Sequence, residues 1–488
     1  LFVATAPPIN HQDKPLNAND FKRQTLLINQ LSFGGPAMAK GDVNGDGLED
    51  VYVGGGVGQS GELWLQSAGG TFRKKASTAF DLDSASMDAD AAMFDANNDG
   101  HMDIYVASGG YHTFTSNNAA LLDRLYINDG KGNFRKDKDA LPQVGGSNAT
   151  VAVADVNGDG SNDIFVGGRV VPGRYPEPPQ SYVLINNGSG KFSDQTASLA
   201  PGVERLGMVT DAAWLDVNKD GKQDLVIVGE WMPIAVFENS DKGFLPATEK
   251  YFDRSYEGWW NTLTVADVNG DEVADLLVGN LGINTQFGVS ETTPAEIYFD
   301  DFDNNGSVDP IFCYFVQGKS YPSATRDELL DQLSSLRRKF NSYKSYASVT
   351  LADIFSPEEI ENAGRMQANF MKTSVFLGQV NGKFTEKPLP VEAQYSPVHS
   401  ITVLDYDADG RDDILLCGNN SYSKLRVGKF DANYGALFKG KGNGEFAYVS
   451  QPGSGFNLKG DVRSVVQVDK FLLFGVCQGK MKAYTFND

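Results

Sequence analysis

Short apolar runs recur along the whole chain and alternate with turns rich in Gly, Asn and Asp. Runs such as VYVGG (51–55), IYVAS (104–108) and IFVGG (164–168) each follow an Asp. A second kind of segment, for example RLYINDGKGNFRKD (124–137), has an alternating strand pattern, an Asn/Gly turn and a Phe that opens the next strand. Alternation with a period of two, interrupted by such turns, predicts β-hairpins.

The hairpins form a larger repeat. Four short strands recur about every 50–60 residues with few helices between them, which is typical of β-propeller blades. A single small sheet cannot bury both of its faces, so we expect the blades to pack around an axis. The Phe residues that follow the second turn of each unit are expected in the core between sheets; they are Phe72, Phe134, Phe192, Phe244, Phe384 and Phe446. We therefore predict an all-β fold, a β-propeller of four-stranded blades.

The blade count and the closure of the ring depend on two places in the chain. Residues 461–486 contain three strand patterns, and QTLLINQL (24–31) is predicted to be a lone strand, so we expect a closing blade shared by the two ends. Two Asp-rich turns, at 267–275 and 301–309, start only 34 residues apart with no Gly-x-Phe hairpin between them. Counting this short unit as a blade gives eight blades, and absorbing it into a neighbour gives seven. We favour eight.

One segment has a helical pattern. In 325–340 the apolar residues fall on one helical face, and Thr325 and Glu328 form a capping box. A second box at Ser356 and Glu359 predicts another helix that runs to about Met371. The expected domains are a polar tail or linker at 1–20, a propeller at 21–322 and 373–488, and a helical insertion at 323–372 within one blade.

A nine-residue Asp-rich loop occurs seven times, starting with DVNGDGLED at 42–50. Positions one and nine are Asp in every copy, positions three and five are Asp or Asn, and position six is Gly in six copies. The residues at positions one, three, five and nine are Asp42, Asn44, Asp46, Asp50; Asp95, Asn97, Asp99, Asp103; Asp155, Asn157, Asp159, Asp163; Asp216, Asn218, Asp220, Asp224; Asp267, Asn269, Asp271, Asp275; Asp301, Asp303, Asn305, Asp309; and Asp405, Asp407, Asp409, Asp413.

This spacing predicts calcium binding. Calcium takes six to eight oxygen ligands, and side chains at alternate positions of a tight loop converge on one point. Gly at position six allows the positive φ that the reversal needs. The alternative is a set of Asx-rich turns without an ion, which seven copies with the same outer Asp pair make unfavourable. We predict up to seven Ca²⁺ ions, with a weak or distorted site at Asp267–Asp275, where Glu272 replaces Gly.

Charge and cysteine content narrow the class of protein. The net charge of −21 argues against nucleic acid and against anionic membrane surfaces as partners. The three cysteines cannot all pair with one another, and Cys313 and Cys417 occupy a strand position where other repeats have a small residue, so we predict buried structural thiols. No apolar run is long enough for a membrane span. Because the chain begins at Leu1 and not at Met, we expect it to be processed or trimmed.

The loops and several longer segments resemble the FG-GAP/VCBS repeat family, in which integrin-α-like propellers carry calcium loops. Segments such as GRVVPGRYPEPPQSY (168–182), GEWMPIAVF (229–237) and GWWNTL (258–263) are similar to a bacterial subgroup related to cartilage acidic protein. The resemblance covers nearly everything from about residue 33 to the end. It implies calcium binding, an extracytoplasmic location that is either cell-surface (outer-membrane anchored, as a lipoprotein) or secreted, and a role in adhesion or ligand capture. It also implies that the chain is part of a longer multidomain protein.

The long connections are expected on the face opposite the calcium loops. An adaptable face on a rigid scaffold is typical of a binding surface, and its candidate ligand-binding residues are Arg169, Arg174, Tyr175, Trp231, Trp259 and Trp260. Aromatic and Arg side chains suit sugar rings or an extended peptide, while the alternative is that they pin the loops in place.

Three functions follow from these observations. The first is a non-catalytic calcium-binding propeller of the bacterial envelope that captures a glycan or peptide ligand or acts in adhesion. The second is a structural subunit of a larger surface complex, which docks a protein partner through the helical insertion. The third is a glycan hydrolase or lyase, for which Glu230 is the best acid, although no paired carboxylate or His/Tyr pair is recognisable. We therefore predict no catalytic residues.

Overall fold

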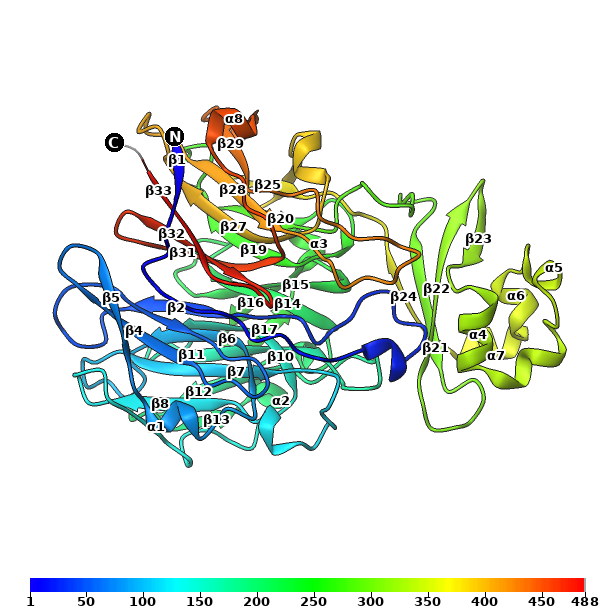
Figure 1. The fold of residues 1–488 in the computed structure, drawn as a ribbon, viewed down its shortest axis with the longest axis horizontal. Helices are drawn as coiled ribbons and strands as arrows, with labels where there is room; N and C mark the ends of the chain where they lie inside the picture. The colour runs from blue at the N-terminus through cyan, green and yellow to red at the C-terminus, as the bar shows by residue number, and fades with distance from the viewer. Residues whose placement is uncertain (487–488) are drawn as a thin grey trace.

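The computed structural model describes residues 1–486 and consists of eight antiparallel sheets with short helices (Figure 1). Each sheet has four strands in order, and one of them carries a fifth strand at its side. The innermost strands of seven sheets contact one another in a closed series, β2–β6–β10–β14–β19–β27–β31 and back to β2. Eight sheets are therefore present, as predicted, and seven of them, the alternative count, form the ring. The eighth sheet is inserted between β20 and β25 and extends away from the ring (Figure 1).

The ring sheets run from the axis outward in chain order. The first three are β2 (Met38–Gly41), β3 (Asp50–Val53), β4 (Glu62–Ser67), β5 (Thr71–Lys75); β6 (Met87–Phe94), β7 (Asp103–Gly109), β8 (Arg124–Asn128), β9 (Phe134–Lys136); and β10 (Ser147–Ala154), β11 (Asp163–Val170), β12 (Tyr182–Asn186), β13 (Phe192–Asp194). The next three are β14 (Met208–Leu215), β15 (Asp224–Pro233), β16 (Ala235–Ser240), β17 (Gly243–Pro246), with β18 (Glu257–Trp259) paired to β15; β19 (Thr262–Ala266), β20 (Asp275–Gly279), β25 (Ser374–Gly378), β26 (Phe384–Pro388); and β27 (Val398–Leu404), β28 (Asp413–Gly418), β29 (Ala436–Gly440), β30 (Phe446–Val449).

The two ends of the chain build the closing sheet. It contains β31 (Val462–Val468), β32 (Phe471–Val476), β33 (Lys482–Phe486) and β1 (Phe2–Thr5), which pairs with β33 in antiparallel register. The expected sharing of a blade is confirmed, but two assignments are wrong. Residues 2–5 are a strand rather than a tail, because Phe2 is buried against Phe456 and Tyr484. Residues 24–31 form no strand and instead cross the face of the ring.

The middle strands of each blade are buried on both sides. Phe192, Phe244, Phe384 and Phe446 are buried in clusters between neighbouring sheets, as expected. Phe72 and Phe134 are partly buried and pack against two other such clusters. All three cysteines are unpaired and buried, and burial raises the pKa of each thiol. Cys313 and Cys417 lie in β22 and β28, and Cys477 directly follows β32.

The inserted sheet has the order β23–β22–β21–β24 and its own helical cover. Its strands are β21 (Ala295–Asp300), β22 (Asp309–Val316), β23 (Lys319–Pro322) and β24 (Gly364–Ala368). Helices α4 (Arg326–Gln332), α5 (Tyr343–Tyr346), α6 (Leu351–Ile354), α7 (Pro357–Asn362) and the 3₁₀ turn Ser334–Arg338 lie between β23 and β24. Both predicted capping boxes are present. The second helix ends at Asn362 and not near Met371, and the segment outside the ring is wider than 323–372 because it includes the sheet.

The remaining helices are single turns. They are α1 (Thr78–Asp81), α2 (Thr196–Leu199), α3 (Thr248–Tyr251) and α8 (Gln451–Ser454), with 3₁₀ turns at Asp20–Lys22, Ala119–Leu121, Pro201–Val203 and Val391–Gln394. Within residues 1–486 no helix combines the length and the apolar character that crossing a bilayer would require.

Candidate calcium loops and axial cavity

All seven Asp-rich loops share one backbone hydrogen bond. The N–H of the sixth residue donates to the Oδ2 of the first Asp at 2.7–2.8 Å in every loop. The N–H of the fifth residue donates to Oδ1 of the same Asp, as at Asp159 to Asp155 (3.2 Å). The loop is thereby wrapped around the first carboxylate, which is the geometry in which the side chains of positions one, three and five converge.

Two positions of each loop require a left-handed backbone. Position six has a φ between 78° and 87° wherever it is Gly, and Glu272 at this position of the fifth loop has a φ of 63°. Position four is also left-handed in every loop, for example Lys219 with a φ of 61°. The expected distortion of the fifth loop is not found, because Glu272 adopts the same conformation and donates the same hydrogen bond. The substitution instead places a side chain where the backbone is strained.

The ninth Asp fixes each loop to its sheet. All seven are fully buried, and in each the Oδ2 accepts from the N–H of the second loop residue, as at Asp163 and Val156 (3.2 Å). In the six ring loops Oδ1 accepts a main-chain N–H from the third strand of the same blade, such as that of Asn186 (2.8 Å). Burial and the neighbouring loop carboxylates raise the pKa of six of these groups to about 6. A bound cation would favour the ionised form of such a group.

The donor set of the loops fits calcium. The carboxylate oxygens of Asp301, Asp303 and Asp309 lie within 4.8 Å of one another, and those of Asp405, Asp407 and Asp413 do likewise. The Oδ1 of Asp303 is buried and has no hydrogen-bond partner in the described residues, as expected of an atom that faces a cation. In the seventh loop the ammonium group of Lys439 contacts Asp407 and lies 2.9 Å from Asp409. A positive charge therefore already sits beside the carboxylates of that loop.

The structure places four of the six candidate ligand-binding residues in the interior. Tyr175, Trp231, Trp259 and Trp260 are at most 6% exposed. The first three pack with Phe312 and other residues of the inserted sheet. The expectation of an exposed aromatic surface does not hold for these rings, because the insertion lies against them. Their packing supports the alternative, that they hold the loops and the insertion to the ring.

Glu230 is the centre of a polar network at the edge of this core. Its carboxylate accepts from Arg169 Nη2 (2.5 Å) and from the Tyr175 hydroxyl (2.8 Å), which in turn accepts from Trp231 Nε1 (2.7 Å). Trp231 has a φ of 62°, which is strained for a bulky residue, and it lies at a break in the pairing of β15 with β18. The remaining candidate, Arg174, is about half exposed and pairs with Glu177.

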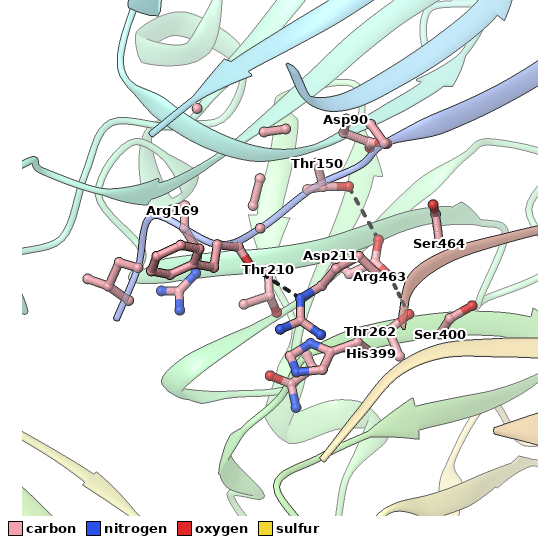
Figure 2. Close-up of a pocket in the computed structure, with 18 of the residues that line it drawn as sticks. Asp90, Thr150, Arg169, Thr210, Asp211, Thr262, His399, Ser400, Arg463 and Ser464 are labelled. Atoms are coloured by element: carbon pink, nitrogen blue, oxygen red, sulfur yellow. Dashed lines mark hydrogen bonds between the residues drawn. The ribbon is translucent and has the colours of Figure 1, made fainter. Parts of the chain in front are cut away.

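A cavity of about 370 Å³ lies on the axis of the ring, and Figure 2 shows residues that line it. The lining residues lie toward the N-terminal ends of the innermost strands, whereas the calcium loops follow the C-terminal ends. Residues from all seven innermost strands or their first turns line it. Thr150 donates to Asp211 (3.3 Å), and Thr262 donates to Asp211 (3.0 Å), so side chains link three successive blades around the axis. Asp90 accepts the N–H of Val151 in the next blade at 2.9 Å.

Sequence reasoning did not find this cavity, although the sequence carries a signal for it. A hydroxyl or carboxyl residue stands five positions before the first Asp of loops two to five and seven, namely Asp90, Thr150, Asp211, Thr262 and Ser400. Ser464 occupies the equivalent place before Asp469 in the closing blade. A polar residue at one register position in successive innermost strands predicts a ring of polar side chains around the axis.

The segment 20–36, which we call the strap, covers the mouth of the cavity. Arg23 donates to the carbonyls of Phe114 (2.7 Å) and Pro172 (3.0 Å), and the buried Gln24 donates to Tyr175 O and Val308 O at 3.0 and 3.1 Å. Buried Asp20 accepts from the N–H groups of Leu31 and Ser32 and so fixes the curve of the strap. The strap thus connects the ring loops to the inserted sheet.

Comparison with known proteins agrees with this geometry. A family model described as FG-GAP-like repeat matches residues 42–106, 95–166 and 216–278. Each match starts at the first Asp of a loop. The chain carries FG-GAP-like repeats. The integrin-α-like repeat type inferred from the loops is confirmed, and the all-β propeller is the fold that these repeats build here.

The curated relatives match only part of the chain. A segment of 145 residues is 28% identical to integrin alpha-3 of Cricetulus griseus and of Mus musculus, and covers 27% of this chain and 14% of those integrins. Two solved structures are similar at low identity. They are the Dos1 propeller (TM-score 0.41, 9% identity, 96% of this chain and 97% of that one) and the V. cholerae biofilm matrix protein Bap1 (TM-score 0.38, 10% identity, 98% and 91%).

Proposed function

We propose that the protein is a non-catalytic, calcium-stabilised binding propeller of the cell envelope, which captures a glycan or peptide through the face opposite the calcium loops. The observation that carries the proposal is the unequal use of the two faces. Calcium loops and tight turns occupy one face, whereas the strap, the long connections and the inserted sheet are gathered on the other, around an axial cavity. A rigid scaffold that displays its variable segments on one face is the usual arrangement of a binding module.

Calcium has a structural role in this proposal. The residues at positions one, three, five and nine would hold the ion and fix the hairpin between the first and second strands of each blade. Neutralising the first-position carboxylates removes repulsion among acidic groups within a few residues of one another. An extracytoplasmic location, at the surface or secreted, suits such loops because calcium is abundant there.

The test is binding to glycan and peptide arrays with calcium and then with chelator. We expect saturable binding to one class that is lost with EGTA and recovered with calcium. Affinity purification of the native protein from envelope extracts with and without calcium checks the result in the natural setting. Failure to bind either array, together with purification alone from the envelope, would contradict the proposal.

A second candidate is a structural subunit that docks through its helices. The observation that favours it is the position of α4–α7, which lie at the far side of the inserted sheet from the ring (Figure 1). Here a stoichiometric protein partner is expected to co-purify. Replacing residues 326–362 by a Gly/Ser linker would release that partner and leave ligand binding by the ring unchanged.

A further inference from the structure

Several polar atoms around the axial cavity have no protein partner. Arg169 Nη1, His399 Nε2, Trp259 Nε1 and Asn148 Oδ1 are buried atoms of lining residues, and none has a hydrogen-bond partner within the described chain. Trp259 is 4% exposed and Asn148 is 2% exposed. An unsatisfied buried polar group costs about 1–3 kcal/mol, and native interiors rarely leave several in one place. The contents of the cavity must therefore supply hydrogen bonds.

The charged groups of the cavity are sorted into two regions. Arg169 and Arg463 line one part together with Glu230, which pairs with Arg169, so two positive charges and one negative charge leave this part with a net charge of +1. Burial, followed by the charges of Arg463 and Arg169, holds the pKa of the nearby His399 imidazole well below its usual range. Asp90 and Asp211 line another part, and burial, followed by the charge of Asp211, raises the pKa of Asp90 to about 7. Figure 2 shows Arg169 set apart from Asp90 and Asp211. A cationic region and an anionic region in one cavity are complementary to a molecule with both charges.

The donors of the cationic region suit a carboxylate. Arg169 uses Nη2 for Glu230 (2.5 Å), and its Nη1 is left free to donate. Trp259 is the antiparallel strand partner of Glu230, so its free Nε1–H belongs to the same part of the wall. Charge-assisted hydrogen bonds from guanidinium to carboxylate are among the strong ones in proteins. The anionic region, with Thr150 and Thr262 beside Asp211, offers only acceptors and hydroxyls to a cationic group.

We propose that the axial cavity binds a small zwitterion of the free amino-acid class, with its carboxylate at Arg169 and Trp259 and its ammonium group at Asp90 and Asp211. The volume of about 370 Å³ is at the small end of ligand pockets and accommodates an amino acid or a dipeptide rather than an oligosaccharide. The inference goes beyond the proposed function, since a ligand inside the ring needs no contact with the outer surface of the loops. It holds whether or not the protein binds a glycan or peptide there.

The strap lies between this site and the solvent, and a residue of the cavity wall bonds to it. Arg463 donates from Nε to the carbonyl of Phe33 in the strap (3.3 Å) and from Nη1 to Asn419 O (2.9 Å). A ligand in the cavity would also lie against strap residues such as Leu31 and Phe33, which line it. Ligand binding is therefore expected to raise the melting temperature and to slow proteolysis within 20–36 as well.

The test is isothermal titration calorimetry of the calcium-loaded protein against the twenty standard amino acids and glycylglycine. We expect at least one to bind with a stoichiometry of one. For that amino acid, the matched carboxylic acid without the amine and the matched amine without the carboxylate should each bind at least tenfold more weakly. The double variant Arg169→Gln/Glu230→Gln, which leaves no unpaired charge, should weaken binding at least tenfold. Arg135→Gln, on an exposed side chain of β9, is the matched control and should bind as the unchanged protein does.

The outcomes separate the alternatives. Absence of binding by every amino acid and by glycylglycine would overturn the proposal, and so would equal affinity for the carboxylic acid without the amine, which would make this a simple anion site. Should the double variant fail to fold, Asp90→Asn tests the other end of the ligand, and unchanged affinity in that variant would also overturn it. The glycan and peptide arrays test binding to the outer face of the loops. A negative result on those arrays therefore does not contradict the binding of an amino acid inside the cavity.

Discussion

The ring and the inserted sheet use the same nine-residue loop in different surroundings. In the ring, the ninth Asp of a loop accepts a main-chain N–H from the third strand of its blade, as Asp163 does from Asn186 (2.8 Å). In the inserted sheet the equivalent Asp309 accepts instead from the side chain of Gln332 in α4, at 2.7 Å. The loop therefore specifies a hairpin whose ninth Asp needs a hydrogen-bond donor. That donor can come from the third strand of the blade or from a helix.

A sheet with such a hairpin belongs to the ring when neighbouring blades pack against both of its faces. Ring sheets are covered on both sides by neighbouring blades through aliphatic and aromatic residues. The inserted sheet packs Ile311 and Cys313 against Leu329 and Leu330 of α4 on one side. On the other side Ile297 and Phe312 meet Trp231 and Trp259 of the ring. On one face of the inserted sheet, helices thus take the place that a neighbouring blade has in the ring. The inserted sheet therefore lies outside the ring.

Calcium removal is the largest expected effect and acts on both regions at once. A ligand present at 100 times its Kd stabilises the folded state by about 2.7 kcal/mol per site. With loops in every ring sheet except the closing one, we expect EGTA to lower the melting temperature by roughly 10 °C or more. Differential scanning calorimetry with calcium, with EGTA and with magnesium measures this. An unchanged melting temperature would contradict the calcium assignment of the loops.

Substitution of the ninth Asp should have different effects on stability in the ring and in the inserted sheet. Asp163→Ala leaves the N–H groups of Val156 and Asn186 buried without acceptors, and we expect a loss of about 2–4 kcal/mol in the stability of the ring. Asp309→Ala frees a side chain, Gln332, and one N–H in a sheet outside the circle, so we expect local opening of the insertion only. Thermal unfolding reports the first effect and limited proteolysis at 323–363 the second. Equal loss of ring stability in both variants would show that the insertion is part of the ring's cooperative unit.

Acid titration of Asp90 at the axis should give a smaller effect, and excess calcium separates it from the titration of the loop carboxylates, such as Asp309 in the inserted sheet. Asp90 has a raised pKa in the folded state, so its protonated form is favoured there, and its contribution to stability is lost as pH rises from about 4 through about 7. Burial and the charge of Asp211 raise this pKa, and Arg169, Glu230, Arg463 and His399 are the other titratable or charged groups that line the cavity. In excess calcium, Asp90→Asn should flatten the fall in unfolding free energy between pH 5 and 7.5. Asp241→Asn, on an exposed turn, is the control and should leave the slope unchanged.

The sequence predicts most of the ring because its signals are local. Alternation, Asn/Gly turns and the loop spacing define each hairpin, and the positions of Asp42 to Asp413 follow from the motif alone. The closing strand was misplaced because 24–31 and 2–5 are both short apolar segments, and only the pairing of Phe2 with Phe486 across the whole chain distinguishes them. A strand partner that is 484 positions away leaves no local pattern.

The candidate site was harder to predict than the fold. Trp231 and Trp259 are placed on the expected face, but the inserted sheet covers them, and a sequence does not reveal which connection folds back over which side chain. The axial residues Asp90 and Asp211 belong to different blades and meet only in the closed ring. Their common register five positions before a loop is visible in the sequence, yet it acquires meaning only with the propeller geometry.

The smallest expected effect compares two loops of the ring itself. Glu272 holds a φ of 63° at the position where Gly221 of the preceding loop has 86°, although both donate the same hydrogen bond to the first Asp. A left-handed conformation costs a non-glycine residue about 1 kcal/mol. Glu272→Gly should therefore raise stability by about 1 kcal/mol in excess calcium, and Gly221→Glu should lower it by a similar amount. Urea unfolding of both variants measures the pair, with calcium titration of the fifth loop as a second readout. If Glu272→Gly were destabilising, the Glu272 side chain would have to contribute a favourable interaction that outweighs its backbone strain.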